Sequence, residues 1–313
     1  MTLVTRLYGL TVRSVLPLHQ ERPVKRDAKV DLDITLGQPI PATDVIPEGR
    51  ILLLLRSQDQ LYVAVETPDD YLLRFFGTCD VSISTDLTAA TIRPVKGADP
   101  AILSVLAGGT LLAFVLTMLG TTVLHGSAVQ IGGCALAFVG ASGMGKSTMA
   151  TLQAADGARL ITDDLLRVDL TNNPPTCSLG ATELRLRKAA GDLAARFDHA
   201  PRRRTTGDER DALRPPDEAD EGLPLKAIVV PFPDKDSPDQ DPQIERLDGM
   251  TAFLMLSRFP RLLGWESQEV LGRQFQQLGD LVDKVPVYAA RLPWGPPFRG
   301  DLAAIVRAAV GLA

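Results

Sequence analysis

Short apolar runs and alternating positions up to about residue 93 are typical of β-strands. Two apolar runs, at 51–55 and 61–65, flank the polar turn 57–59, as the strands of a hairpin do. Further short strands are predicted at 10–12, at 71–76 and around Val81 and Ile83. No catalytic constellation occurs in this part. Residues 1–97 are therefore predicted to form a small, mainly β N-terminal domain that serves packing or partner docking.

The segment from residue 100 to residue 124 contains no charged residue and is long enough to span a bilayer. Gly108 and Gly109 interrupt it, and no lysine or arginine follows it until Lys146. We predict a buried helix with Asp99 as its N-cap and Pro100 in its first turn. A membrane span is the alternative.

The rest of the chain alternates between strand and helix patterns, which predicts an α/β catalytic domain over residues 98–313. Strands are expected at 135–139, 158–162, 225–230 and 285–290, and helices at 149–154, 250–257, 270–282 and 301–310. Between them, residues 198–222 are rich in charge and proline and poor in apolar residues. We expect a solvated or disordered loop there, with a lid that orders on binding as the alternative.

Composition narrows the function further. The chain of 313 residues has a net charge of −5 and a pI near 5.3, so we expect neither a nucleic-acid partner nor an anionic membrane surface. Its three cysteines are widely spaced, which fits the reducing cytoplasm. No secretion signal is recognised at the N-terminus. We expect a cytoplasmic protein.

A glycine-rich stretch carries the most specific chemical signal. Gly140, Gly145, Lys146 and Ser147 fit the phosphate-loop template GxxxxGK[ST], between an apolar strand and a helix. Glycines allow positive φ angles and close approach of a ligand, and the loop amides with the helix N-terminus hold phosphate oxygens. Lys146 would reach the β- and γ-phosphates, and the Ser147 hydroxyl would take a position on Mg²⁺. The residues expected to contact the nucleotide are Gly140, Ser142, Gly143, Met144, Gly145, Lys146, Ser147 and Thr148.

Two adjacent carboxylates, Asp163 and Asp164, end the strand that follows the loop helix. The carboxyl ends of parallel strands meet at the ligand crevice, so the pair is expected near Lys146. One acid would hold Mg²⁺ and the other would take a proton from an attacking hydroxyl. An Asp-Asp turn without a function is the alternative.

Two weaker signals lie further along the chain. Glu183, Arg185 and Arg187 alternate onto one strand face, either near the transferred phosphate or on an exposed edge. Trp294 and Phe298 lie among prolines, where surface-loop packing is favoured over contact with adenine.

The segment from His125-Gly126 through the phosphate loop to Thr162-Asp163-Asp164 resembles the HPr kinase family. It is most similar to the HPr-kinase-like proteins that phosphorylate precursor peptides of lasso-peptide pathways, and phosphoenolpyruvate carboxykinases share the core more remotely. The resemblance implies a P-loop kinase core of the HPr kinase and phosphoenolpyruvate carboxykinase type, with ATP and Mg²⁺.

The resemblance also implies residue roles. Asp163 would be the general base on the acceptor hydroxyl, and His125 would lie beside it and tune its proton affinity. Asp164 would bind Mg²⁺ together with Ser147, and Glu183 would add a further acidic group to the metal shell. Relatives often form homo-oligomers.

One departure from the family changes the expected substrate. Leu186-Arg187-Lys188 stands where the bifunctional HPr kinase/phosphorylases carry a glycine-rich signature. Phosphorolysis and HPr itself are therefore not expected, and the C-terminal serine of a lasso-peptide precursor is the expected acceptor. A small-metabolite kinase and a non-catalytic nucleotide-binding regulator are the alternatives.

Overall fold

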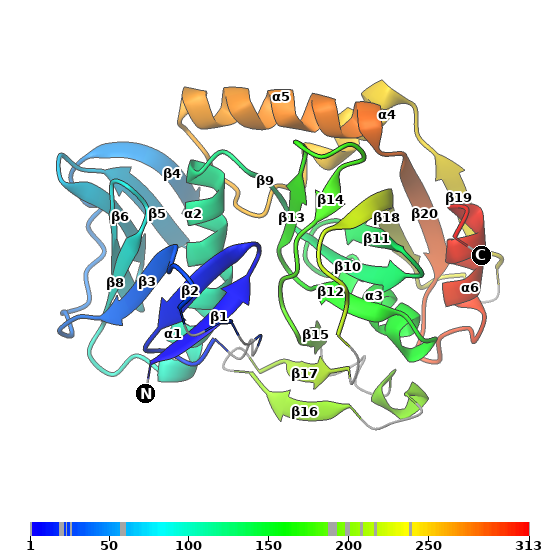
Figure 1. Ribbon diagram of the computed structural model, residues 1–313, viewed down its shortest axis with the longest axis horizontal. Coiled ribbons are helices and arrows are strands. Elements are labelled where there is room, and N and C mark those ends of the chain that lie inside the picture. The colour runs from blue at the N-terminus through cyan, green and yellow to red at the C-terminus, as the bar shows by residue number, and fades with distance from the viewer. Residues whose placement is uncertain are drawn as a thin grey trace. The chain divides into compact units, whose positions relative to one another are not determined.

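The computed structural model describes residues 2–18, 22, 24–25, 27–56, 61–186, 193–197, 201–206, 209–215, 218–237 and 240–312 (Figure 1). The chain divides into two compact units. Unit 1 comprises Met1–Thr121 and Leu262–Gln274, and unit 2 comprises Thr122–Arg261 and Phe275–Ala313. The division differs from the expected boundary at residue 97, because the long apolar helix and a later segment group with the N-terminal strands.

Unit 1 is built on an eight-stranded sheet with the order β1-β2-β3-β8-β7-β6-β5-β4. The strands are β1 Leu3–Leu7, β2 Leu10–Ser14, β3 Leu32–Leu36, β4 Arg50–Arg56, β5 Leu61–Glu66, β6 Asp70–Phe75, β7 Cys79–Ser84 and β8 Ala89–Pro94. β4 and β5 pair antiparallel as the predicted hairpin, and its predicted turn lies outside the described residues.

The apolar helix of unit 1 is continuous through α1 (Pro100–Leu106), a π-helical turn η1 (Ala107–Leu111) and α2 (Leu112–Met118). The Asp99 side chain accepts a hydrogen bond from the Ala101 amide at 2.9 Å, which confirms the predicted N-cap. Phe114 stacks on Trp265 with ring centroids 5.8 Å apart. Among the described residues, this is the one helix that is long and apolar enough to cross a membrane, and 61% of its 18-residue window is buried within the protein. The expected burial is thus observed.

Unit 2 contains a nine-stranded mixed sheet with the order β12-β10-β11-β18-β14-β13-β9, in which β20 pairs with β18 and β19. Its strands are β9 Thr122–Leu124, β10 Gly126–Ile131, β11 Cys134–Val139, β12 Arg159–Thr162, β13 Leu166–Asp169, β14 Thr176–Cys177, β18 Leu223–Asp234, β19 Gln243–Arg246 and β20 Val287–Pro293. Its helices are α3 Lys146–Ala155, α4 Gly249–Leu256 and α6 Leu302–Ala309. Helix α5, Gln268–Lys284, begins in unit 1 and belongs to unit 2 from Phe275 onward.

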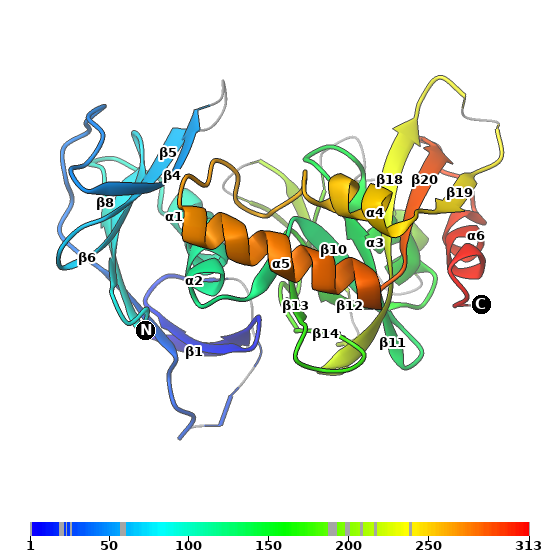
Figure 2. The same cartoon turned by 90° about the horizontal axis from the view of Figure 1, so that it is seen from above.

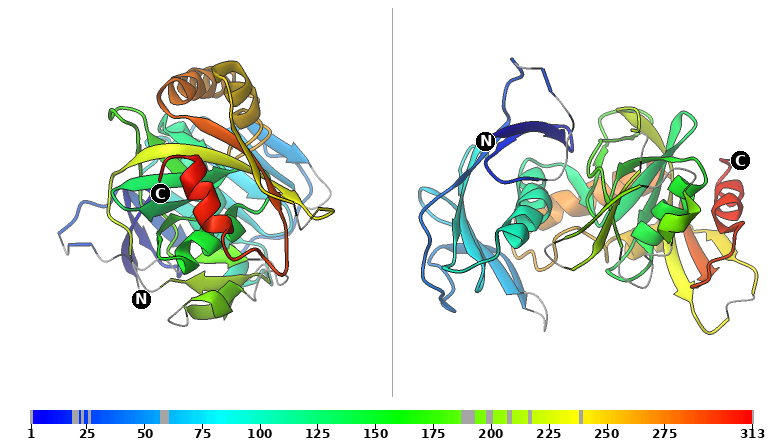
Figure 3. Two further views of the ribbon diagram at one scale, coloured as in Figure 1. Left: turned by 90° about the vertical axis from the view of Figure 1, so that its right-hand side faces the viewer. Right: turned by 90° about the horizontal axis from the view of Figure 1, so that it is seen from below.

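Helices cover both faces of this sheet. Leu136, Phe138 and Val229 pack with α3 and α6 on one face. Alternate residues of the same strands, Ala137 and Ile228 among them, pack with α4 and the C-terminal half of α5 on the other face. Figure 2 shows α3 beside α6, and Figure 3 shows strands between helices in its left view. Strands buried on both faces explain the continuous apolar runs in the sequence.

The course of β10 decides where the site forms. β10 pairs antiparallel with both β11 and β12, with Gly126 opposite Val139 and Ala128 opposite Thr162. β11 and β12 are therefore parallel to each other but not adjacent. Their carboxyl ends share one edge with the beginning of β10, which brings the residues around His125 to the phosphate loop.

The charged segment at 198–222 is not simply a loop. Among its described residues, β17 (Asp211–Arg214) pairs with both β15 (Leu184–Leu186) and β16 (Arg202–Thr205) in a three-stranded sheet, drawn below β12 in Figure 1. The expectation of a structureless loop was wrong, because Ala212 and Leu213 are buried and offset the polar surroundings. Residues 198–200, 207–208 and 216–217 lie outside the described residues.

Candidate active site

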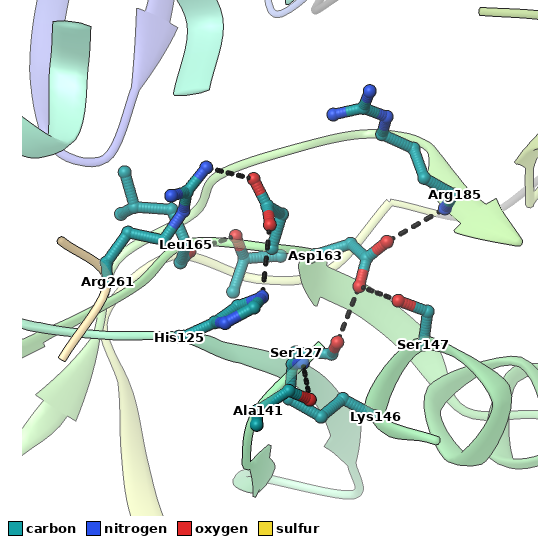
Figure 4. A network of polar contacts seen from close by, with 11 residues as sticks. His125, Ser127, Ala141, Lys146, Ser147, Asp163, Leu165, Arg185 and Arg261 are labelled. Carbon is teal, nitrogen blue, oxygen red and sulfur yellow. Dashed lines mark hydrogen bonds and ion pairs between the residues drawn. The ribbon is translucent and has the colours of Figure 1, made fainter. Parts of the chain in front are cut away.

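The phosphate loop connects the end of β11 to the start of α3, as the motif predicts. Gly143 and Gly145 both have a φ of +86°, which favours glycine. Gly140 has no positive φ; a Cβ there would lie 3.2 Å from the Met144 sulfur, so its small size serves packing. The Lys146 Nζ donates to the Ala141 carbonyl at 2.9 Å and so spans the loop (Figure 4).

Asp163 is a buried acceptor of three hydrogen bonds. Its Oδ1 accepts from the Ser147 hydroxyl at 2.8 Å and from the Ser127 hydroxyl at 2.5 Å. Its Oδ2 accepts from the Arg185 amide at 2.8 Å. Figure 4 shows both serines pointing toward this carboxylate from different elements. Asp163 thus ties together the loop helix, the start of β10 and β15.

Asp164 faces a different set of groups. Its Oδ2 accepts from Arg261 Nη2 at 2.7 Å, and its Oδ1 lies 3.3 Å from His125 Nε2. The residue has a φ of +72°, a left-handed turn that aspartate tolerates better than most side chains. Adjacent carboxylates at a strand end consequently diverge.

These contacts reverse the pairing that the family resemblance implies. His125 was expected beside Asp163, and Ser147 was expected to share a metal with Asp164. The structure pairs His125 with Asp164 and Ser147 with Asp163. The reason is the turn after Thr162, which directs the first acid toward α3 and the second toward Arg261.

Electrostatics distinguish the ionisable groups. Burial lowers the pKa of Lys146 to about 8, against the opposing attraction of Asp164 and Asp163. Burial also lowers the pKa of His125, although the hydrogen bond to Asp164 opposes the shift. Burial disfavours the charged form of Asp164, yet the Arg261 charge and the His125 hydrogen bond lower its pKa well below the usual value. At neutral pH this arrangement favours a neutral imidazole beside an ionised carboxylate.

Glu183 does not reach the loop. Both of its oxygens accept from Arg204, with distances of 3.0 and 3.1 Å to Nε and 2.6 Å to Nη2. It is absent from the pocket lining described below, and its expected place in a metal shell stays a prediction. Arg185 does line the pocket, and Arg187 lies outside the described residues. The Glu183–Arg204 pair instead joins β16 to the residue before β15.

A pocket of about 390 Å³ opens beside the phosphate loop within unit 2. It is lined by His125, Ser142, Gly143, Gly145, Lys146, Ser147, Thr148, Asp163, Asp164, Arg185, Leu186, Arg210, Lys235, Trp294, Gly295, Pro296 and Phe298. Most of the predicted site residues therefore converge on one cavity. Gly140 and Met144 shape the loop without lining it.

Sequence reasoning missed Ser127, Arg210, Lys235 and Arg261. Ser127 belongs to an apolar strand, and the other three lie far along the chain from the motif. No local pattern marks them, since only the fold brings them to the loop. Trp294 and Phe298 were assigned to surface packing, but both line the pocket.

The ligand set suits a hard divalent cation. The described residues contain no group of three or more His, Cys, Asp or Glu side chains that could hold a metal alone. Ser147 and Asp163 supply neighbouring oxygens next to the phosphate loop. Mg²⁺ is commonly held by one or two such protein oxygens together with water and substrate phosphates. The residues thus fit Mg²⁺ bound together with a nucleotide.

Comparison with known proteins finds similarity among solved structures. No protein-family model matches the chain, and no curated protein matches it. Among solved structures, the chain is similar to the Hpr(Ser) kinase/phosphatase from Coxiella burnetii, with 12% identity and a TM-score of 0.32. The match covers 61% of this chain and 94% of that chain. The proposal of a nucleotide and its metal rests on the contacts of this chain's own residues.

Proposed function

We propose that the protein is an ATP- and Mg²⁺-dependent kinase that transfers the γ-phosphoryl group to a serine hydroxyl of a peptide. The observation that carries the proposal is the contact between Ser147 and Asp163, which line one pocket together with Lys146. A phosphate loop with an acid-bound serine is the arrangement by which P-loop kinases hold a nucleotide and its metal.

The phosphate loop would bind the triphosphate. The amides from Ser142 to Thr148 and the N-terminus of α3 provide donors for phosphate oxygens. Lys146 and Arg210 add positive charge. The two side chains lie near enough to each other that the Arg210 charge contributes to lowering the pKa of Lys146. Both would neutralise charge on the transferred group.

Ser147 and Asp163 would hold Mg²⁺, which neutralises phosphate charge when bound. This assignment replaces Asp164 by Asp163 as the metal ligand, because only Asp163 contacts Ser147. Asp164 then remains as the acid that receives the proton. It is kept ionised by Arg261 and would orient the acceptor hydroxyl, with His125 completing its hydrogen bonding.

The acceptor is proposed from the family resemblance. It is the C-terminal serine of a lasso-peptide precursor, in the cytoplasm, with neither nucleic acid nor membrane required. Two further cationic residues of the pocket lining, Arg185 and Lys235, are not assigned to the triphosphate. A free C-terminal carboxylate beside the acceptor hydroxyl would match their charge.

The test is label transfer from γ-radiolabelled ATP with Mg²⁺. The acceptors are a peptide ending in serine with a free carboxylate, its C-terminal amide, its serine-to-alanine analogue, and a panel of sugars and hydroxy acids. We expect label on the first peptide and none on the alanine analogue. Label on a sugar or hydroxy acid alone would indicate a metabolite kinase instead, and ATP binding without any transfer would indicate a regulator.

The Asp164→Asn variant makes the test specific to the site. Loss of a general base lowers rates by about 10²–10⁴-fold, so transfer should nearly vanish while ATP still binds. Transfer at the wild-type rate would remove Asp164 from the mechanism.

A further inference from the structure

An aromatic pair stands beside the phosphate loop in a fixed position. The Trp294 amide, directly after β20, donates to the Asp234 carbonyl at the end of β18 at 2.9 Å. Trp294 and Phe298 contact edge to face, with ring centroids 5.3 Å apart and planes at 88°. The Arg196 guanidinium donates to the Phe298 carbonyl. Both ends of the segment are thus held by hydrogen bonds.

The indole lies directly on the phosphate loop. A Cβ built on Gly145 would lie 2.2 Å from Trp294 Cη2 and 2.5 Å from Cζ2, so no other residue fits there. Gly145 immediately precedes the lysine that would hold the phosphates. The ring is therefore next to the expected triphosphate and not at a distant part of the surface.

The same ring is part of the pocket wall. Trp294 is half-buried, Phe298 is buried, and both line the pocket together with Pro296. The loop side of the pocket is polar, with Ser142, Lys146 and Ser147. One cavity therefore offers a phosphate-binding side and an aromatic side, which are the two surfaces that a nucleotide requires.

We propose that Trp294, supported by Phe298, forms the nucleobase site, with the base stacked on the indole while the loop holds the phosphates. The inference rests on the proposed function in that it takes a nucleotide as the pocket's ligand. A rigid aromatic side chain suits the role because every base presents a π-face on which it can stack.

Tryptophan fluorescence tests this directly. The chain has two tryptophans, and Trp265 packs on Phe114 in unit 1. In a Trp265→Phe protein, Trp294 is the only tryptophan. Mg²⁺ with ATP, or Mg²⁺ with inorganic tripolyphosphate, is titrated while binding is followed in parallel by calorimetry. ATP should change Trp294 emission saturably, whereas tripolyphosphate should bind without an equal change.

Two variants add a readout of affinity. Trp294→Ala should weaken ATP binding by about ten- to a hundredfold, and tripolyphosphate binding by less than about twofold. Trp294→Phe keeps a stacking face and should lose less, which guards against a folding defect in the alanine variant. Phe275→Ala is the matched control, since Phe275 is exposed on α5 and lines no part of this pocket.

The outcomes separate this inference from the proposed function. ATP binding with no change in Trp294 emission, or equal losses for ATP and tripolyphosphate in Trp294→Ala, would overturn the nucleobase site and leave the kinase proposal standing. Base-dependent quenching of Trp294 emission without phosphoryl transfer to any acceptor would support the nucleobase site and contradict the kinase proposal. Absence of ATP binding would overturn both.

Discussion

The hydroxyl of Ser147 lies 2.8 Å from Oδ1 of Asp163. Ser147 stands in the first turn of α3, whereas Asp163 follows β12, which is not adjacent to the strand β11 that precedes the loop. The contact joins Asp163 to the helix that follows the glycine-rich loop. Asp164, one residue later, is held by Arg261 and His125. Because the two acids have different partners, we expect mutations of each to have separable effects.

Asp163→Asn should abolish the effect of Mg²⁺ on ATP affinity. The buried amide would also present an NH₂ group to donors that now face a carboxylate, at a cost of about 1–3 kcal/mol in stability. Calorimetric titration of ATP with and without Mg²⁺, together with a thermal melt, measures both effects. The Asp164→Asn protein is the control and should retain the Mg²⁺ effect. Loss of the Mg²⁺ effect in Asp164→Asn, with the effect retained in Asp163→Asn, would instead support Asp164 as the metal ligand that the family resemblance implies.

ATP binding should weaken as the pH rises through about 8. Burial lowers the pKa of Lys146 to about 8 in the free protein, and phosphate binds the charged form. Above that pH, binding must first return a proton to Lys146, so the dissociation constant should increase by up to about tenfold per pH unit. Titrations between pH 7 and 9.5 measure it, with Lys146→Arg as the variant that stays charged. A flat profile in the wild-type protein would contradict the assignment.

The free protein should show the complementary effect on stability. Because the folded-state pKa of Lys146 lies below its unfolded value, the lysine destabilises the fold at neutral pH, and this cost falls as the pH rises from about 8 to 10. Lys146→Met should therefore stabilise the nucleotide-free protein by about 1–3 kcal/mol while impairing ATP binding. Urea unfolding at pH 7 measures the change, and a destabilised variant would show that the Ala141 hydrogen bond matters more.

Arg261→Met should destabilise the protein by about 2 kcal/mol at pH 7, since it leaves a mostly buried Asp164 without its main ion pair. The folded-state pKa of Asp164 is depressed, so its stabilising contribution is present above pH about 4 and lost as the pH falls through the folded value. The difference between variant and wild type should accordingly shrink at acid pH. Arg258→Met, which removes an arginine over the Phe259 ring, is the control and should show no such pH dependence.

Glu183 and Arg204 should behave as a structural pair. Glu183→Gln, Arg204→Met and the double variant should show a coupling energy of about 1 kcal/mol in urea unfolding, because each single change removes the same partly buried ion pair. The Mg²⁺ concentration for half-maximal transfer should stay unchanged in all three. A higher Mg²⁺ requirement in Glu183→Gln alone would instead place this carboxylate in the metal shell.

The chain by itself determined the features that depend on neighbouring residues. The phosphate loop follows from the positive φ angles that only glycine adopts easily, and the cap of α1 follows from Asp99 next to Pro100. Strand and helix patterns predicted most elements of both units, because burial on one or both faces leaves a period in the sequence. These are interactions within a few residues of each other.

Tertiary structure decided what depends on groups far apart in the chain. The antiparallel strand β10 between β11 and β12 brings Ser127 and His125 to the loop. The glycine motif alone does not reveal this strand order. The turn at Asp164 directs the side chains of the two acids to different partners. Arg204 forms an ion pair with Glu183, and the Trp294 ring packs on Gly145. Adjacent acids look alike in a sequence, and only the partners that the fold assembles around each one give it a distinct charge state and direction.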